Sequence, residues 1–308
     1  MAQQNNRPVA VVVTHNRRDM LMRCLDALGR QTEQCDIMVI DNASSDGTRE
    51  AVLNRNDKRI AYVDTGSNLG GAGGFAFGIQ AALDARRERI WIMDDDVIPS
   101  ANALENLCGE DRRRNGQYGW LSSKCVMPNG RICPMNLQRA TPFKKIEQEK
   151  LNSDNTSVPS QMASFVSLFF RAETVRRFAL PFAEFFIWSD DLEWTRRISL
   201  KLPCFTVPAS IVTHAISGTA ASNIALDTPE RIPRYFYAFR NEFFVYRREG
   251  IRGIVYYTAK TALNFARILF RARDRRRERL NVLLSGVIAG ISFKPRISTE
   301  PTKEIHSL

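Results

Sequence analysis

Apolar residues in the first third of the chain follow two alternating periods. Short runs rich in β-branched residues predict buried strands at 8–13, 36–40, 60–63 and 89–93. Apolar positions at helical spacing predict the helices between them, at 19–30, 45–53 and 73–87. Strands that alternate with helices indicate a doubly wound α/β sheet, whose ligands collect beyond the carboxyl ends of the strands.

Polar segments directly follow three of these predicted strands. They are 14–17 (THNR), 41–42 (DN) and 94–96 (DDD). Because the carboxyl ends of parallel strands lie at one edge of a sheet, we expect the three segments to converge on a single crevice.

The last of these segments is a run of three aspartates, Asp94, Asp95 and Asp96. Adjacent carboxylates repel one another, which raises their pKa values unless a cation shares the charge. Mg²⁺ or Mn²⁺ is usually held by one or two carboxylates together with substrate phosphates. The motif therefore predicts a divalent-metal site and a nucleotide-diphosphate substrate. An acidic turn or a helix N-cap is the alternative interpretation.

Charge and cysteine usage narrow the class of protein. The 308 residues carry a formal net charge of +11, which predicts an anionic partner. The six cysteines form no CxxC pair and no Cys/His cluster of zinc spacing, so neither a disulfide framework nor a structural zinc is predicted and a reducing cytoplasm fits best. The N-terminal segment lacks the layout of a signal peptide, and no apolar stretch reaches the length of a bilayer span.

The composition changes from Arg231 onward, where aromatic and aliphatic residues alternate with arginine clusters. Segment 253–270 is amphipathic, and the apolar segment 280–293 is too short to span a bilayer. Basic amphipathic helices bind anionic lipid, so 251–293 predicts a peripheral contact with a membrane surface. A helical subdomain packed on the rest of the chain, or on a dimer partner, is the alternative. The absence of a zinc finger or an RNP-like strand in the sequence makes nucleic acid an unlikely partner.

Five segments carry a family resemblance. VVVTHNRRDMLMRCLDAL, DIMVIDNASSDGT, NLGGAGGFAFG, WIMDDD and FFIWSDDLEWTRRI occur in the order seen in the family 2 glycosyltransferases of GT-A fold. The resemblance covers roughly 8–214 and is strongest to bacterial galactofuranosyltransferases, with rhamnosyltransferases close behind. It implies a catalytic domain at 1–230, with a donor half at about 1–100 and an acceptor half at about 101–230, followed by a helical region at 231–308.

The resemblance also implies roles for residues on the donor side. Thr14 and Arg17 would meet the nucleotide, and Asp41 would hold the uracil or the ribose, although Asp41 also fits a turn. The glycine-rich start of the predicted helix at 73–87 suits close approach of a sugar diphosphate, and Asn68 and Gly71 are the expected ligand-facing pair. Tight packing of helix on sheet is the alternative role of the glycines Gly73, Gly74 and Gly78.

A second acidic pair, Asp190 and Asp191, begins a predicted helix. Glycosyl transfer requires removal of the acceptor's hydroxyl proton, and the family places the general base at the position of Asp191. Asp190 and Trp188 would then bind the acceptor. Helix capping by these acids is the alternative, purely structural role, and it is compatible with catalysis.

His214 follows a short predicted strand at 209–213. It has a role only through the resemblance. In galactofuranosyltransferase-like enzymes a histidine at this place completes the metal site, which makes Asp94, Asp96 and His214 the expected ligands of Mn²⁺ or Mg²⁺. Asp95 is then left for hydroxyls of the donor sugar or ribose.

The sequence thus predicts an inverting, metal-dependent glycosyltransferase at the cytoplasmic face of the cell membrane. Its expected donor is UDP-galactofuranose, and its expected acceptor is a hydroxyl of a cell-surface glycan or a polyprenyl-linked sugar. Transfer from dTDP-rhamnose is the alternative reaction, and a membrane-associated scaffold that binds nucleotide sugar without turnover is the non-enzyme alternative. An oligomer is compatible with the sequence.

Overall fold

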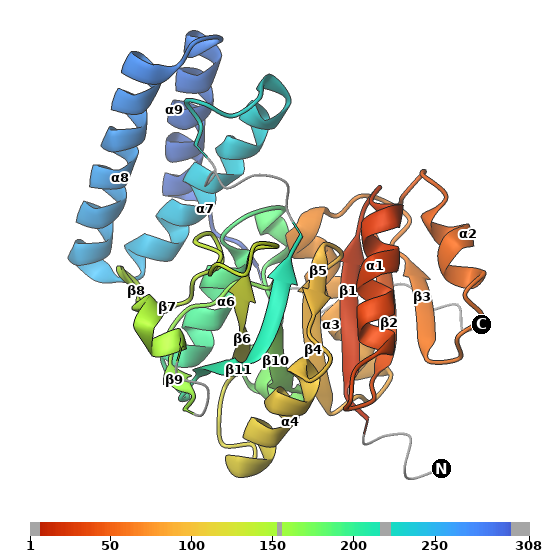
Figure 1. Ribbon diagram of the computed structural model, residues 1–308. Helices are drawn as coiled ribbons and strands as arrows, with labels where there is room; N and C mark the ends of the chain where they lie inside the picture. Colours follow the sequence, from red (N-terminus) through yellow and green to blue (C-terminus); the bar gives the residue numbers. More distant parts are fainter. Residues whose placement is uncertain (1–6, 153–155, 216–222, 297–308) are drawn as a thin grey trace.

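A computed structural model describes residues 7–152, 156–215 and 223–296 (Figure 1). Within these ranges the centre of the molecule is a nine-stranded sheet of order β3-β2-β1-β4-β10-β6-β11-β5, with β9 paired to β11. Its strands are β1 (Val9–Thr14), β2 (Asp36–Asp41), β3 (Ile60–Asp64), β4 (Arg89–Asp94), β5 (Val97–Pro99), β6 (Leu121–Val126), β9 (Val158–Pro159), β10 (Leu168–Arg171) and β11 (Phe205–His214). A separate small hairpin pairs β7 (Arg139–Thr141) with β8 (Lys144–Lys145).

The sheet is mostly parallel, which confirms the predicted α/β class. β1 lies between β2 and β4 and is parallel to both, whereas β10 runs antiparallel to its neighbours β4 and β6. β11 is parallel to β6 and antiparallel to β5. The carboxyl ends of β1, β2, β4, β6 and β11 therefore lie along one edge of the sheet.

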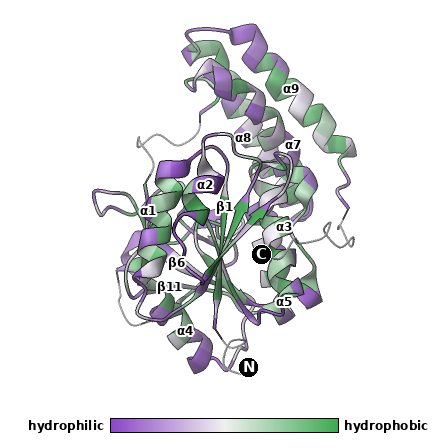
Figure 2. Cartoon of the chain, turned by 90° about the vertical axis from the view of Figure 1, so that its right-hand side faces the viewer, coloured by the Kyte–Doolittle hydropathy of each residue, from purple (hydrophilic) through white to green (hydrophobic). Residues whose placement is uncertain are grey.

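Helices cover both faces of the sheet. The helices of the described chain are α1 (Arg18–Gly29), α2 (Thr48–Leu53), α3 (Gly70–Asp84), α4 (Ala103–Arg113), α5 (Ala172–Phe178), α6 (Asp190–Ser199), α7 (Tyr235–Arg247), α8 (Gly250–Arg271) and α9 (Arg276–Ser292), with 3-10 turns at η2 (Gln148–Leu151), η3 (Ala183–Phe185) and η4 (Pro229–Arg234). Apolar residues of α1 and α4 pack on one face of the sheet, and those of α3, α5 and α6 pack on the other. The strands between them are buried on both sides, as their continuous apolar runs predict (Figure 2).

The predicted elements of the first third are found within a few residues of their expected bounds. β11 differs, because it begins at Phe205 whereas the sequence predicted a strand only from 209 to 213. Its pairing with β6 shifts register between Val207 and Ile211, around Pro208. Proline cannot donate a ladder hydrogen bond and marks irregular strand positions, so the pattern hides the first half of this strand.

Two glycines of α3 pack tightly against the sheet. A Cβ at Gly74 would lie 2.6 Å from Val13 Cγ1, and one at Gly78 would lie 2.6 Å from Val11 Cγ1. These positions bring the helix close to β1, so close packing rather than ligand contact explains them.

The last three helices form a unit beside the sheet (Figure 1). α7 packs its Phe244 against Phe182 and Phe185, just ahead of the helix that begins at Asp190. Arg248 and Glu249, which follow α7, form ion pairs with Glu193 and Arg196 of α6. The ion pairs and the aromatic contacts hold this unit against α6 and the segment before it, as the subdomain alternative expects. None of the helices in the described parts of the chain combines the length and the apolarity that a membrane span requires.

Candidate active site

The sheet register brings the three polar segments to one edge. Thr14 pairs with Asp41 across β1 and β2, and Val13 pairs with Asp94 across β1 and β4. The ends of these three strands therefore lie in adjacent rows, and the expected convergence is found. His214 ends β11, where it pairs with Val97 of β5.

A compact polar cluster forms at this edge. The Thr14 hydroxyl donates to Asp95 Oδ2 at 2.7 Å, and Arg17 donates to Asp95 Oδ1 at 3.3 Å and to Asp96 Oδ2 at 2.6 Å. His214 Nε2 lies 3.1 Å from Asp96 Oδ1. Asp95 and Asp96 are buried, whereas the Arg17 side chain is 54 % exposed and can reach a ligand from solvent.

Burial and mutual repulsion shift the pKa values of these groups. Burial and the charge of Asp96 raise the pKa of Asp94 to about 7, and burial raises that of Asp95 to about 6 against the opposing effect of Arg17. Burial also opposes ionisation of Asp96, but His214 and Arg17 outweigh it and lower the pKa of Asp96. Burial lowers the pKa of His214, but Asp96 and Cys133 overcome this effect and raise it to about 10.

The same residues fit a divalent cation. Asp96 Oδ1 is buried and lies 3.1 Å from His214 Nε2, so a carboxylate oxygen and a ring nitrogen already face each other at one point. Asp94 beside it keeps a raised pKa, which is the sign of a carboxylate whose charge lacks compensation. Two carboxylates and one imidazole make a donor set that suits Mn²⁺ as well as Mg²⁺.

A strained loop carries the second acidic pair to the same edge. Phe186, Trp188 and Ser189 all have positive φ values, of 63°, 66° and 68°, directly before Asp190 begins α6. Positive φ is costly for residues with a side chain, and such strain persists only where the surroundings impose it. Ser189 makes no side-chain cap bond, so capping by this residue does not explain the conformation.

Gly70 is one of the residues that impose this backbone conformation on the loop. Its φ is +72°, and a Cβ here would lie 2.2 Å from the Phe186 carbonyl oxygen, which accepts a hydrogen bond from the backbone N–H of Ala72 at 3.1 Å. The glycine-rich start of α3 therefore serves to seat the loop that carries the acids.

Asn241 of α7 is the second residue that holds this loop in its conformation. This fully buried residue donates from Nδ2 to the carbonyl oxygens of Phe185, Ile187 and Trp188, at 3.0, 3.1 and 2.9 Å. One amide thus holds three successive parts of the loop, from a position 53 residues after Trp188. Asn241 therefore positions Asp190 and Asp191 without touching them.

We expect replacement of Asn241 by alanine to lower kcat about 10- to 100-fold, because small displacements of a reacting group have effects of this size. The donor KM should change little, since the donor-side cluster keeps its own contacts. Steady-state kinetics with purified protein would measure both values, and Asn281→Ala, an exposed change on α9, is the matched control. An unchanged kcat with a lowered melting temperature would assign Asn241 a structural role only.

The two aspartates of the loop lie in different surroundings. Asp190 is buried, and burial together with repulsion from Asp191 and Asp94 raises its pKa well above the usual value. Burial raises the pKa of Asp191 to about 6, and its Oδ1 accepts the backbone N–H of Leu192 at 2.7 Å. Asp94 is near enough to contribute to the raised pKa of Asp190, so the two acidic segments lie near each other.

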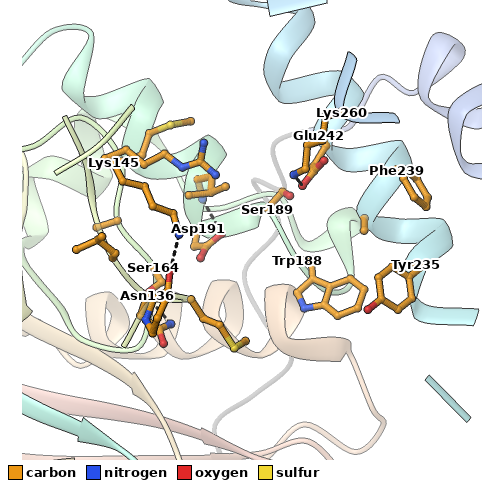
Figure 3. A pocket seen from close by; sticks show the side chains of 18 of the residues that line it. Asn136, Lys145, Ser164, Trp188, Ser189, Asp191, Tyr235, Phe239, Glu242 and Lys260 are labelled. Atoms are coloured by element: carbon orange, nitrogen blue, oxygen red, sulfur yellow. Dashed lines mark hydrogen bonds and ion pairs between the residues drawn. The ribbon is translucent and has the colours of Figure 1, made fainter. Parts of the chain in front are cut away.

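Asp191 opens into a cavity of about 350 Å³ between the acceptor half and the C-terminal helices (Figure 3). Trp188 lies on its wall and packs on Tyr235 of α7, with ring centroids 5.0 Å apart. Other parts of the wall come from α7 and α8, including Glu242 and Lys260, which form an ion pair. The cavity is large enough for a small ligand and combines aromatic with charged walls.

Two of the other residues expected on the donor side, Asp41 and Asn68, make hydrogen bonds within the fold. Asp41 is fully buried and accepts hydrogen bonds from the Ser44 N–H at 2.8 Å and the Tyr62 hydroxyl at 2.7 Å, so its role in a turn is real. Asn68 accepts the Gly70 N–H at 2.9 Å. Gly71 faces open space, because a Cβ there would meet no atom within 4 Å. These three lie near the strand ends but are not bonded to the aspartate cluster.

The sequence reasoning missed several residues of the site. Asn136 Oδ1 lies 2.9 Å from His214 Nδ1, yet nothing in its local pattern marks it. Asn241 has one available signal, a polar residue on the buried side of an aromatic helix. The sequence has no Cys/His cluster of zinc spacing, yet the fold brings ligand atoms of Cys125, Cys133 and His214 within 4.8 Å of one another. Their sequence separations are too irregular for a zinc motif.

Solved structures share the fold. TarS of S. aureus aligns over 93 % of this chain and 44 % of its own length, at a TM-score of 0.54 and 15 % identity, and shorter TarS structures (residues 1–349) contain UDP or UDP-GlcNAc. GalNAc-T7, solved with UDP, GalNAc and Mn²⁺, aligns over 80 % of this chain and 52 % of its own at a TM-score of 0.56. The fold is therefore of the GT-A class.

Sequence comparisons are more specific. The model of glycosyl transferase family 2 matches residues 9–172, and the chain belongs to this family of glycosyltransferases. Galactofuranosyltransferase GlfT1 of Mycolicibacterium smegmatis is 27 % identical over 258 residues, which cover 80 % of this chain and 85 % of that protein. GlfT1 of Mycobacterium tuberculosis is 28 % identical over 262 residues, covering 80 % and 84 %. The chain is thus an enzyme of glycosyl transfer with galactofuranosyltransferases among its relatives.

Proposed function

We propose that the protein transfers galactofuranose from UDP-galactofuranose to an acceptor hydroxyl, with inversion at the anomeric carbon. The observation that carries this proposal is that Asp191 opens to a cavity while its buried neighbour Asp190 lies near enough to Asp94 to be repelled by it. This proximity supports a general base on one side of the reacting carbon and a diphosphate site on the other. The names of the relatives support the sugar, and the UDP in the TarS structures supports the nucleotide.

Residues at the strand ends form the donor site of this proposal. Asp94, Asp96 and His214 would hold Mn²⁺ or Mg²⁺, and the cation would neutralise charge on the departing diphosphate. Arg17 has an exposed guanidinium that can turn toward a phosphate, with which arginine pairs through two hydrogen bonds. Asp95, held by Thr14, is directed at sugar or ribose hydroxyls. Asp41, Asn68 and Gly71 complete the nucleotide side.

On the acceptor side, the Asp191 carboxylate takes the hydroxyl proton as the new glycosidic bond forms. The bond from the anomeric carbon to the diphosphate oxygen breaks in the same displacement, so the configuration inverts. Asp190 and Trp188 orient the acceptor, Trp188 by offering an aromatic face to sugar C–H groups. Burial raises the pKa of Asp191 to about 6, which suits a base that acts near neutral pH.

The charge of the cavity favours an acceptor that carries an anionic group, such as a polyprenyl-linked glycan. Arg139 and Lys145 line it, and in the described structure their side-chain hydrogen bonds reach oxygens of Tyr246, Pro142 and Pro134. Arg267 of α8 adds a third cation to the wall. In this proposal the domain at 1–230 and the region from about 231 onward both line the acceptor site.

The same helices present an apolar surface to solvent. On α8 and α9, Ile251, Val255, Phe270, Ile288 and Ile291 are 81, 62, 83, 67 and 63 % exposed. The turn between the helices adds exposed arginines, at 271, 273 and 275–277. Hydrophilic and hydrophobic residues alternate on both helices (Figure 2). We propose that this surface binds an anionic membrane peripherally, at its cytoplasmic face, where a lipid-linked acceptor would be presented.

We expect the protein to sediment with vesicles that contain anionic lipid and much less with neutral vesicles. Phe270→Glu should weaken binding about tenfold or more, because burial of one aromatic side chain stabilises binding by about 1.5–3 kcal/mol. Leu200→Glu, at an exposed leucine that follows α6, is the matched control. Equal binding of all three proteins would contradict the membrane role of this surface.

A donor panel tests the proposed reaction. Purified protein would be supplied with UDP-galactofuranose, UDP-hexopyranoses or dTDP-rhamnose, together with Mn²⁺, Mg²⁺ or a chelator. Turnover of UDP-galactofuranose alone, abolished by the chelator, is the expected result. Turnover of another donor would contradict the proposed donor sugar but remain consistent with the proposed mechanism. Turnover that persists with the chelator would contradict the proposed metal site.

A further inference from the structure

Three potential soft ligands lie together on one face of the sheet, behind the aspartate cluster. Cys125 is near the end of β6, and Cys133 lies opposite it across the hairpin that follows, with a hydrogen bond from the Cys133 N–H to the Cys125 carbonyl at 2.9 Å. β11 is parallel to β6, and Cys125 pairs with Val212. His214, two residues further, points to the same face as Val212 because side chains alternate along a strand.

The ligand atoms of these three residues converge. Cys125 Sγ, Cys133 Sγ and a ring nitrogen of His214 all lie within 4.8 Å of one another, and all three residues are buried. Asn136 Oδ1 marks the point of convergence, because it accepts from Cys133 Sγ at 3.1 Å and lies 2.9 Å from His214 Nδ1. A tetrahedral zinc site places its ligand atoms roughly 3.5–4 Å apart, so only small movements of side chains are needed.

We propose that Cys125, Cys133 and His214 Nδ1 form a binding site for a thiophilic metal ion such as Zn²⁺, distinct from the carboxylate site at Nε2. Two sulfurs and one imidazole nitrogen select soft ions over Mg²⁺. Asn136 or a water molecule supplies the fourth ligand. The two thiols lose their protons to solvent as the metal–sulfur bonds form.

The site has an entry path. Asn136 contacts both His214 and Cys133, and it also lines the cavity into which Asp191 opens (Figure 3). Rotation of this amide opens the site to an ion in the cavity. A soft ion therefore needs no unfolding of the sheet to reach the thiols.

Occupation of this site would inhibit the enzyme, a consequence that rests on the proposed function. An imidazole bound to metal through Nδ1 keeps its proton on Nε2, where it faces Asp96 Oδ1 at 3.1 Å. Nε2 then has no lone pair for the Mn²⁺ or Mg²⁺ of the donor site. His214 can thus serve one of the two sites at a time.

Cobalt binding to the reduced full-length protein tests the site without any measurement of activity. Co²⁺ bound by thiolates gives an intense charge-transfer absorption that carboxylate and imidazole ligands do not give. We expect one such Co²⁺ per chain, displaced by Zn²⁺ and not by Mg²⁺. Cys125→Ser and Cys133→Ser should each lower the affinity at least about tenfold, whereas Cys108→Ser, a buried cysteine of α4, should leave it unchanged.

The outcomes separate the two proposals. Absence of the thiolate absorption in the folded protein, or its retention when both Cys125 and Cys133 are serine, would overturn the thiophilic site. Normal turnover with Mn²⁺ in the Cys125→Ser variant, together with lost inhibition by Zn²⁺, is the expected result in the assay. If the protein binds cobalt through thiolates but turns over no donor, the thiophilic site is supported and the proposed function is contradicted.

Discussion

Replacement of Asp191 by asparagine is expected to lower kcat about 10²- to 10⁴-fold while the affinity for the nucleotide sugar stays nearly unchanged. General-base catalysis contributes a factor of this size, and asparagine keeps the shape of the side chain while it cannot accept the proton. Turnover would be followed with donor and acceptor, and donor binding would be measured separately by calorimetry. Equal loss of donor affinity would move Asp191 to the donor site.

A control and a pH profile sharpen this result. Glu173→Gln also removes a carboxylate from the first turn of a helix, on exposed α5, and should leave kcat unchanged. Because burial raises the pKa of Asp191 to about 6, the wild-type rate should rise as the pH increases through that region and the base loses its proton. A variant without the base should lack this rise, and its persistence in Asp191→Asn would assign the titration to another group.

Replacement of Asp96 by asparagine is expected to weaken Mn²⁺ binding about a hundredfold or more and to reduce turnover in parallel. The carboxylate is buried, and its two oxygens contact Arg17 and His214, at 2.6 and 3.1 Å. Loss of a direct ligand should exceed the 10- to 100-fold effect of an outer-shell change. Free Mn²⁺, measured by electron paramagnetic resonance with UDP present, reports the affinity.

Proton release gives this prediction a second readout. The pKa of His214 is raised to about 10, so the imidazole is protonated at neutral pH and must lose its proton to bind a metal through Nε2. Mn²⁺ affinity should therefore increase with pH, and binding in weak buffer should acidify the solution. Asp84→Asn, at an exposed aspartate of α3, is the control and should match the wild type. Wild-type Mn²⁺ affinity in Asp96→Asn would exclude this carboxylate as a ligand.

Local patterns were sufficient to predict the donor half. The strands and helices up to Asp94 show clear periods of two kinds, and each polar segment lies directly after a strand. Parallel strands place the segments that follow them at one edge of the sheet. Errors of a few residues in the predicted strand bounds therefore did not change the predicted position of these segments. The glycine run was less informative, because Gly70 seats a loop 116 residues away in sequence and Gly74 and Gly78 pack on strands.

The acceptor side depended on tertiary contacts. Its cavity has walls from the segment 134–139, from the loop at Trp188 and from α7 and α8, and these share no local pattern. Asn241 acts through three carbonyl groups of a loop that the chain left about 50 residues earlier. Hydrophobic periodicity carries no information about such contacts, because a single buried amide does not change the period of a helix.

The sequence by itself determined the doubly wound sheet, its acidic edge and the basic amphipathic C-terminal helices, because each follows from the residues of one short segment. Only the tertiary structure decided that antiparallel β10 separates β4 from β6, and that β11 lies beside β6. That strand order brings His214 both to Asp96 and to the cysteines at 125 and 133. Strand order depends on which apolar faces pack together across the whole chain, so the two possible partners of one histidine are visible only in the folded protein.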